Sequence, residues 1–303
     1  MFHRFFSMSL TRWRYLGLGL SVLLTLASLG LLAINGLQLG LDFTGGILLE
    51  FKIQTLKDAH EINALLGEPL RALVSLQPAG VPGEWLIKLP PEGLTMPAQE
   101  LADRLATQLG LPVELLRTTI VGPQVGAELF QQGMMAVLVA SIAISVYLAF
   151  RFEWRQAVGI LLSVLHDAVV ALGLLALFHI EFDLNVIAGL MAVIGYSLND
   201  SIVISDRLRD ILSSRTRLGM HECSDIAIKA TFSRTMITSG TTLFTVGALL
   251  LFGGDALHGF AFTLFVGILT GTLSSITVAS TVQELLGLSP AAYQKKEALP
   301  EAA

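Results

Sequence analysis

The stretch "LNVIAGLMAVIGYSLNDSIVISDRLRD", residues 184–210, contains an apolar run that ends in basic residues. A transmembrane helix needs about 20 predominantly apolar residues. Asn199 and Asp200 lie inside the run. An ionisable side chain there costs about 2.5–3.5 kcal/mol on insertion scales and normally faces a protein interior or a water-filled cavity. The stretch therefore predicts a membrane helix over 184–205 with a costly carboxylate near its inner end.

The composition indicates a membrane protein. The chain has 303 residues, of which 53% are hydrophobic and 14% are charged, whereas soluble domains have about 25% charged residues. Much of the surface is therefore expected to face lipid. The net charge of −5 gives no reason to expect a nucleic-acid partner. The single cysteine, Cys223, excludes an intramolecular disulfide and a multi-cysteine metal site, and nothing predicts a cofactor.

Six apolar segments have the length of membrane helices. They cover residues 15–37, 132–150, 157–178, 184–205, 236–253 and 257–282. The first follows three arginines, as a signal peptide would, but its apolar run is longer than the 7–15 residues of a signal peptide, and its end is a poor cleavage site. We therefore interpret it as a retained anchor.

The basic residues predict the orientation. Lys and Arg are enriched in short cytoplasmic loops. Of the 19 Lys and Arg residues, 13 lie in four segments, 1–14, 151–156, 206–235 and 283–303, and none in the loops 179–184 and 253–259. These four segments are therefore expected to be cytoplasmic, with both termini inside the cell.

Residues 38–131 are the only connection long enough to form a domain, and the predicted orientation places them outside the cytoplasm. Strand-like segments cover 46–54, 70–79, 83–90 and 112–122, and helical segments cover 56–67 and 96–110. The order βαββαβ predicts a small α+β ferredoxin-like domain. No catalytic constellation is present in its sequence, so a binding or mechanical module is expected.

Polar residues inside the spans are the candidate functional residues. His166 and Asp167 lie near the middle of the third span, and Arg234 lies at the inner entry of the fifth. Burial favours the neutral form of a carboxyl group, and a nearby guanidinium favours its charged form. We therefore predict that Asp200 and Arg234 form an ion-coupling site. His166, Asp167, Asn199 and Thr241 are expected to form a secondary polar network.

Structural roles for the same residues are the alternative. Asp200 and Arg234 can form a static ion pair that locks two helices together. His166 and Asp167 can form a polar contact between helices, and Asn199 a hydrogen bond between helices. Gly267 and Gly271, four residues apart in the sixth span, are typical of close helix packing.

Six motifs, in order along the chain, carry a resemblance to a known family. They are "GLDFTGG" (40–46), "VGPQVGAEL" (121–129), "HD" (166–167), "GYSLNDSIVISDRLRD" (195–210), "SRTMITSGTTL" (233–243) and "LFGGDALHGFAFTLFVGILTGTLSSI" (251–276). The chain resembles the SecD/SecF family of the bacterial Sec protein translocase, a member of the resistance-nodulation-division superfamily, and it is most similar to the SecF subunits.

The resemblance implies a non-enzymatic subunit of the inner (plasma) membrane. It implies that the chain pairs with SecD and uses the proton motive force to assist export through the SecYEG channel, after the SecA motor has started translocation. SecYEG, SecA and the auxiliary subunits of the translocase are the further partners that it implies. The exported domain would then handle the preprotein. The family's intramembrane acid falls on Asp200 and its essential arginine on Arg234. The coupling ion is expected to be H+, with Na+ as the alternative. Because transporters of this superfamily have two six-span halves, SecD is expected to supply the second half.

Three other functions are compatible with parts of the pattern. A small-molecule efflux half-transporter would have a much larger exported domain. A scaffold that holds translocase parts together would tolerate neutral substitutions at Asp200 and Arg234. An intramembrane aspartyl protease would use Asp167 and Asp200, but their expected depths in the membrane differ.

Overall fold

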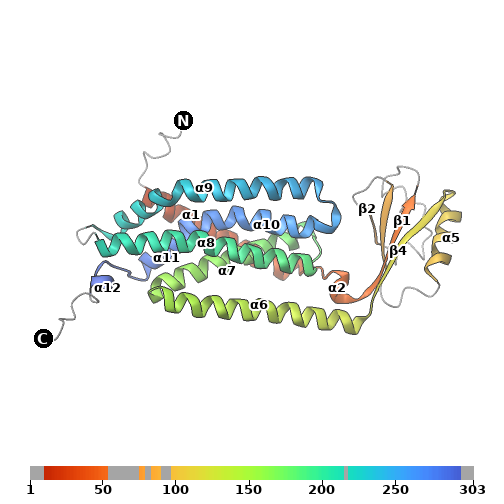
Figure 1. Cartoon of the computed structure of the whole chain (residues 1–303), viewed down its shortest axis with the longest axis horizontal. Helices are drawn as coiled ribbons and strands as arrows, with labels where there is room; N and C mark the ends of the chain where they lie inside the picture. The colour runs from red at the N-terminus through yellow and green to blue at the C-terminus, as the bar shows by residue number, and fades with distance from the viewer. Residues whose placement is uncertain (1–9, 54–74, 79–82, 90–96, 215–217, 295–303) are drawn as a thin grey trace.

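The computed structural model describes residues 10–53, 75–78, 83–89, 97–214 and 218–294. Figure 1 shows two parts, a bundle of long helices and a small sheet domain beyond one end of the bundle. The first turn of α1 and the short helix α12 lie at the opposite end of the bundle from the sheet.

Six helices in the described residues are long and apolar enough to cross a membrane, which confirms the predicted number of membrane helices. They are α1 (Leu10–Asn35), α6 (Pro123–Arg151), α7 (Trp154–Phe178), α8 (Leu184–Ser214), α9 (Met220–Phe252) and α10 (Asp255–Ser274). The last continues as a π-helical turn, η2 (Ser275–Ala279), and as α11 (Ser280–Leu285), which α12 (Ala291–Gln294) follows.

The helices extend beyond the apolar runs that predicted them. Residues 206–235, expected as a loop, are helical over 206–214 and 220–235, and α6 begins nine residues before position 132. In these extensions Leu208 and Leu212 of α8 pack against Cys223 and Ala227 of α9. The two helices therefore continue because they bury amphipathic faces against each other, and an average of hydropathy does not detect this.

The sheet domain contains β1 (Gly46–Ile53), β2 (Ser75–Pro78), β3 (Glu84–Leu89), β4 (Val113–Val121) and the helix α5 (Ala98–Leu109). Its strands are antiparallel in the order β2-β3-β1-β4. Alternate residues of β1 and β3, such as Phe51 and Ile87, pack against Ala102 and Leu105 of α5. The helix expected over 56–67 and part of the strand expected over 70–79 lie outside the described residues.

A short segment joins the sheet domain to the bundle. It consists of α2 (Leu41–Thr44) and two glycines, Gly45 and Gly46. The carboxylate of Asp42 accepts a hydrogen bond of 3.2 Å from the backbone N–H of Leu184, the first residue of α8. Lys88 of β3 forms an ion pair of 2.5 Å with Glu181, which lies just before α8. The sheet domain is therefore bonded to the start of the helix that carries Asp200.

Close packing of α10 on α8 forms the centre of the bundle. A Cβ atom on Gly267 would lie 2.1 Å from Cγ2 and 2.8 Å from Cβ of Val193, and a Cβ atom on Gly271 would contact Ser197. Small residues let two membrane helices approach at the level of their backbones. The predicted close-packing role of Gly267 and Gly271 is confirmed.

Replacing Gly267 with Ala is expected to destabilise the bundle by about 1–3 kcal/mol, the usual cost of overpacking a core. The added methyl group would overlap Val193, including its Cβ atom, so α10 has to move away from α8. Thermal unfolding in detergent would measure the loss. The control is Gly195→Ala on α8, where a Cβ atom meets nothing within 4 Å. Equal melting temperatures for the two variants would contradict the prediction.

Candidate functional site

Asp200 lies where α8, α9 and α10 meet. Its side chain is buried, with the residue 8% exposed. One carboxylate oxygen accepts a hydrogen bond of 3.3 Å from the Ser239 hydroxyl of α9, which in turn accepts a hydrogen bond of 2.8 Å from Thr272 of α10. Asn199 donates a long hydrogen bond of 3.5 Å to the other oxygen. Neutral groups thus surround this carboxylate.

A small cavity borders the Asp200 side chain. Its volume is about 10 Å³, and Tyr196, Ser197, Ser239, Gly271 and Thr272 contribute to its lining. A cavity needs ~10–15 Å³ to hold one water molecule, together with polar partners for that water. The cavity is therefore close to the size of a single water, and hydroxyl groups line it.

Arg234 does not contact Asp200. It is exposed on α9, five residues before Ser239, which is about 7.5 Å along the helix axis. Within the described residues, no hydrogen bond or ion pair joins the two side chains. The alternative of a static ion pair is therefore not realised in this conformation. The same helix also exposes large apolar side chains, among them Ile237 and Phe244.

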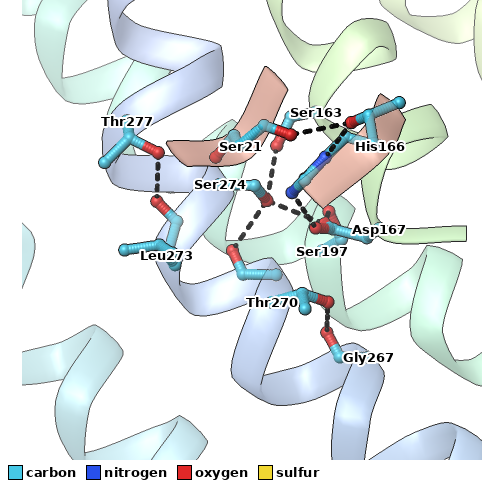
Figure 2. A network of polar contacts seen from close by, with 12 residues as sticks. Ser21, Ser163, His166, Asp167, Ser197, Gly267, Thr270, Leu273, Ser274 and Thr277 are labelled. Carbon is cyan, nitrogen blue, oxygen red and sulfur yellow. Dashed lines mark hydrogen bonds and ion pairs between the residues drawn. The ribbon is translucent and has the colours of Figure 1, made fainter. Parts of the chain in front are cut away.

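A second polar cluster surrounds Asp167 (Figure 2), which is fully buried. Its Oδ2 accepts hydrogen bonds of 2.5 Å from Ser197 and 2.8 Å from Ser274. The neighbouring His166 places Nε2 3.9 Å from Asp167 Oδ1, and its Nδ1 lies 2.7 Å from the Thr25 hydroxyl of α1. The expected polar contact between helices is therefore present.

The predicted site residues are only partly brought together. Ser197 bonds to Asp167 and also lines the cavity beside Asp200, so the two acids lie on either side of one serine. Ser197 is three residues before Asp200, or about 4.5 Å along α8. No hydrogen bond joins the two carboxyl groups among the described residues, so they do not form the paired acids of an aspartyl protease.

Thr241 lies outside the network in which it was expected. It is exposed, and its hydroxyl donates to the carbonyls of Ile237 and Thr238 on its own helix. Thr238, Thr242 and Thr245 also donate to carbonyls four residues earlier. Ser and Thr hydroxyl groups on helices commonly make their hydrogen bond to a backbone carbonyl of the same helix.

The sequence analysis missed the hydroxyl groups that do contact the acids. These are Ser197 and Ser274 at Asp167 and Ser239 at Asp200, with Thr272 bonded to Ser239 and Thr25 beside His166. For Thr272 and Ser274 the signal was the dense run of Ser and Thr between residues 270 and 281 of the sixth span.

Two family models match this chain. Residues 103–288 match the family model described as "Protein export membrane protein SecD/SecF, C-terminal", and residues 30–55 match the "SecD/SecF GG Motif". The second match covers α2 and the two glycines that lead into the sheet domain.

Relatives and solved structures extend the match to most of the chain. The protein translocase subunit SecF of Escherichia coli O157:H7 is 40% identical, over 91% of this chain and 87% of that protein. The SecF of Pseudomonas aeruginosa is also 40% identical, over 91% and 90%. The crystal structure of SecDF from Thermus thermophilus, a translocon-associated membrane protein, has a TM-score of 0.78 and 34% identity over 91% of this chain.

This chain spans only 38% of that SecDF chain. A second SecDF structure, in a "Super-membrane-facing form", has a TM-score of 0.67 and 34% identity. The resemblance inferred from the sequence motifs is confirmed. The chain belongs to the SecD/SecF family of protein export membrane proteins, in its SecF branch.

Proposed function

We propose that this multi-pass membrane protein is a non-enzymatic accessory subunit of protein export that acts together with SecD. In this proposal it lies in the bacterial inner membrane and uses the proton motive force to assist preproteins through SecYEG after SecA has started translocation. The names and the coverage of the SecF relatives support the export role. The SecDF chain, of which this chain spans 38%, supports the pairing with a SecD part.

The proposed ion-coupling group is Asp200. The observation that carries this proposal is a buried carboxylate to which no cation of the described part of the chain is bonded, placed beside hydroxyl groups and a cavity close to the size of one water. A buried charge is costly unless it is paired or neutralised. A carboxylate held by neutral groups alone is suited to binding and releasing a proton. Na+ is the alternative coupling ion.

Arg234 would modulate this group from outside its immediate surroundings. Arg234 is exposed on α9, on a face that a second six-helix half would cover. Movement of that half would then move the Arg234 side chain relative to Asp200. An approaching guanidinium favours the charged carboxylate, and a retreating one favours the neutral acid. Movement of α9 relative to α8 would therefore switch the affinity of Asp200 for a proton.

The sheet domain is proposed to be ferredoxin-like and periplasmic, and to handle the emerging preprotein. The antiparallel order β2-β3-β1-β4 with α5 between β3 and β4 supports the fold. The distribution of basic residues supports the location, with both termini in the cytoplasm. The bonds from Asp42 and Lys88 to the segment around the start of α8 supply the connection between domain and helix.

Complementation tests the proposed function. Bacteria that lack their own SecD and SecF would receive this chain with the SecD from the same source, and export of a secreted preprotein would be followed. The expected result is restored export that declines when the proton gradient is collapsed. Export that stays defective in the complemented strain, together with altered drug sensitivity, would instead favour the efflux function and contradict the proposal.

A further inference from the structure

His166 and Asp167 present two unsatisfied atoms to each other inside the bundle. His166 is 5% exposed and Asp167 is 0% exposed. Asp167 Oδ2 has two serine donors, whereas Oδ1 has no hydrogen-bond partner among the described residues. His166 Nε2 also has none and lies 3.9 Å from that oxygen. Buried polar atoms without partners are rare in folded proteins and call for an explanation.

The hydrogen bond to Thr25 assigns the histidine tautomer. The Thr25 hydroxyl donates to the carbonyl of Ser21 at 2.8 Å, so its oxygen is left to accept from His166 Nδ1 at 2.7 Å. A neutral imidazole carries only one N–H group. With the proton on Nδ1, Nε2 holds a lone pair. Two acceptors, Nε2 and Asp167 Oδ1, therefore face each other with no donor between them.

One proton bound between Nε2 and Oδ1 supplies the missing hydrogen-bond donor. On Asp167 it gives a neutral acid that can donate to Nε2, and on Nε2 it gives an imidazolium that can donate to the carboxylate, once the two atoms approach from 3.9 Å to hydrogen-bonding distance. Both forms have no net charge, whereas the unprotonated pair buries one negative charge at a large cost. We propose that His166 and Asp167 together bind one proton and exchange it with Asp200 across Ser197.

Ser197 connects the two acids. Its hydroxyl donates to Asp167, and its side of α8 lines the cavity beside Asp200 together with Gly271. When a proton crosses, an O–H bond on Asp200 breaks and an O–H bond on Asp167 or an N–H bond on His166 forms, with no transfer of electrons. The exchange rests on the proposed role of Asp200, but the one-proton pair does not.

Few other charges can influence the pair. The residue ranges 16–35, 129–150, 156–178, 184–205, 235–252 and 259–283 make up the apolar parts of the six long helices. In these ranges the Asp, Glu, Lys, Arg and His residues are His166, Asp167 and Asp200 alone. The groups that face the pair from α1, α8 and α10 are the hydroxyls of Thr25, Ser197, Thr270 and Ser274. Asp200 is therefore the ionisable group with which the pair can exchange protons.

Two further features mark this cluster. Ser274 is the last residue of α10, and the π-helical turn η2 begins at the next position. Single π-helical turns inside α-helices occur frequently at functional sites. His166 also lines a second, largely apolar pocket of about 210 Å³ between α1, α7, η2 and α11. His166 thus borders this pocket, whereas Asp167 bonds to Ser197.

The test uses the chain assembled with its SecD-type partner in lipid vesicles, with proton flux driven by an imposed gradient. Asp167→Asn keeps the shape and the acceptor for the serines but cannot carry the proton. A positioned acid–base group contributes typically ~100-fold or more to proton transfer, so the flux is expected to fall about 100-fold. Ser163→Ala is the matched control, because Ser163 bonds to Ser274 and not to either member of the pair.

Infrared difference spectra between acid and alkaline samples supply an independent readout. A contribution from the Asp167 carboxyl or the His166 imidazolium is expected in wild type and in Asp200→Asn, and it should disappear in Asp167→Asn and His166→Gln. If Asp200→Asn stops the flux but Asp167→Asn does not, the proton exchange is wrong and the function of Asp200 stands. If neither variant changes the flux, both are wrong. If no such spectral contribution exists, the one-proton pair is overturned, even where a variant fails to assemble.

Discussion

Replacing Asp200 with Asn is expected to abolish the stimulation of export by the proton gradient while the complex still assembles. Asparagine has nearly the same shape and still offers an oxygen to Ser239, so the contacts between α8, α9 and α10 persist. The amide cannot bind and release a proton. Ion conductance and export, measured together on wild type and variant with the partner subunit present, check the prediction.

The control for Asp200→Asn is Thr241→Val. Thr241 lies on the same helix as Ser239, but it is exposed and bonds only to its own helix. Its replacement is expected to leave both conductance and export near the wild-type level. If Asp200→Asn supports full gradient-driven export, Asp200 is not the coupling group, and the scaffold hypothesis gains support.

The contrast between Ser239 and Thr241 shows where prediction from sequence ends. Both belong to the run of hydroxyl residues in the fifth span, two positions apart. In the structure Ser239 donates to Asp200, whereas Thr241 faces away and donates to its own helix. The acids were recognisable because a carboxyl group in an apolar run is costly wherever it points. A hydroxyl group is not costly in this way, because it can bond to its own helix. The rotation of the packed helix therefore decides which hydroxyl group contacts the site.

For the fold as well, the number of membrane helices was predictable from the sequence, whereas the ends of the helices were not. Six apolar runs are sufficient to predict six spans, because lipid imposes that pattern on every membrane helix. The ends of the helices depend instead on local packing, as for Leu208 and Leu212 of α8 against α9 beyond the apolar run. The exposed position of Arg234, without a bond to Asp200, was also not predictable, because it depends on how α9 is rotated in the packed bundle.

Replacing Gly46 with Ala is expected to loosen the sheet domain and to stop export while the six helices stay intact. Gly46 has a φ of +144°, and a Cβ atom there would lie 2.5 Å from the backbone oxygen of Leu89. Such a backbone conformation costs a residue other than glycine of order 1–3 kcal/mol. The oxygen belongs to β3, which pairs with β1 from Ile47 onward, so the sheet has to open where it joins α2.

Limited proteolysis separates the two parts of the molecule. In Gly46→Ala, cleavage within the sheet domain is expected to accelerate about fivefold or more, because 1 kcal/mol corresponds to about that change in the open population. Cleavage within the bundle should not change. The matched control is Gly122→Ala at the other junction, where φ is −68° and a Cβ atom meets nothing within 4 Å. If the two variants show the same rate of cleavage and the same level of export, the junction between α2 and β1 does not need a glycine at position 46. The bonds from Asp42 and Lys88 would then be sufficient to hold the domain against α8.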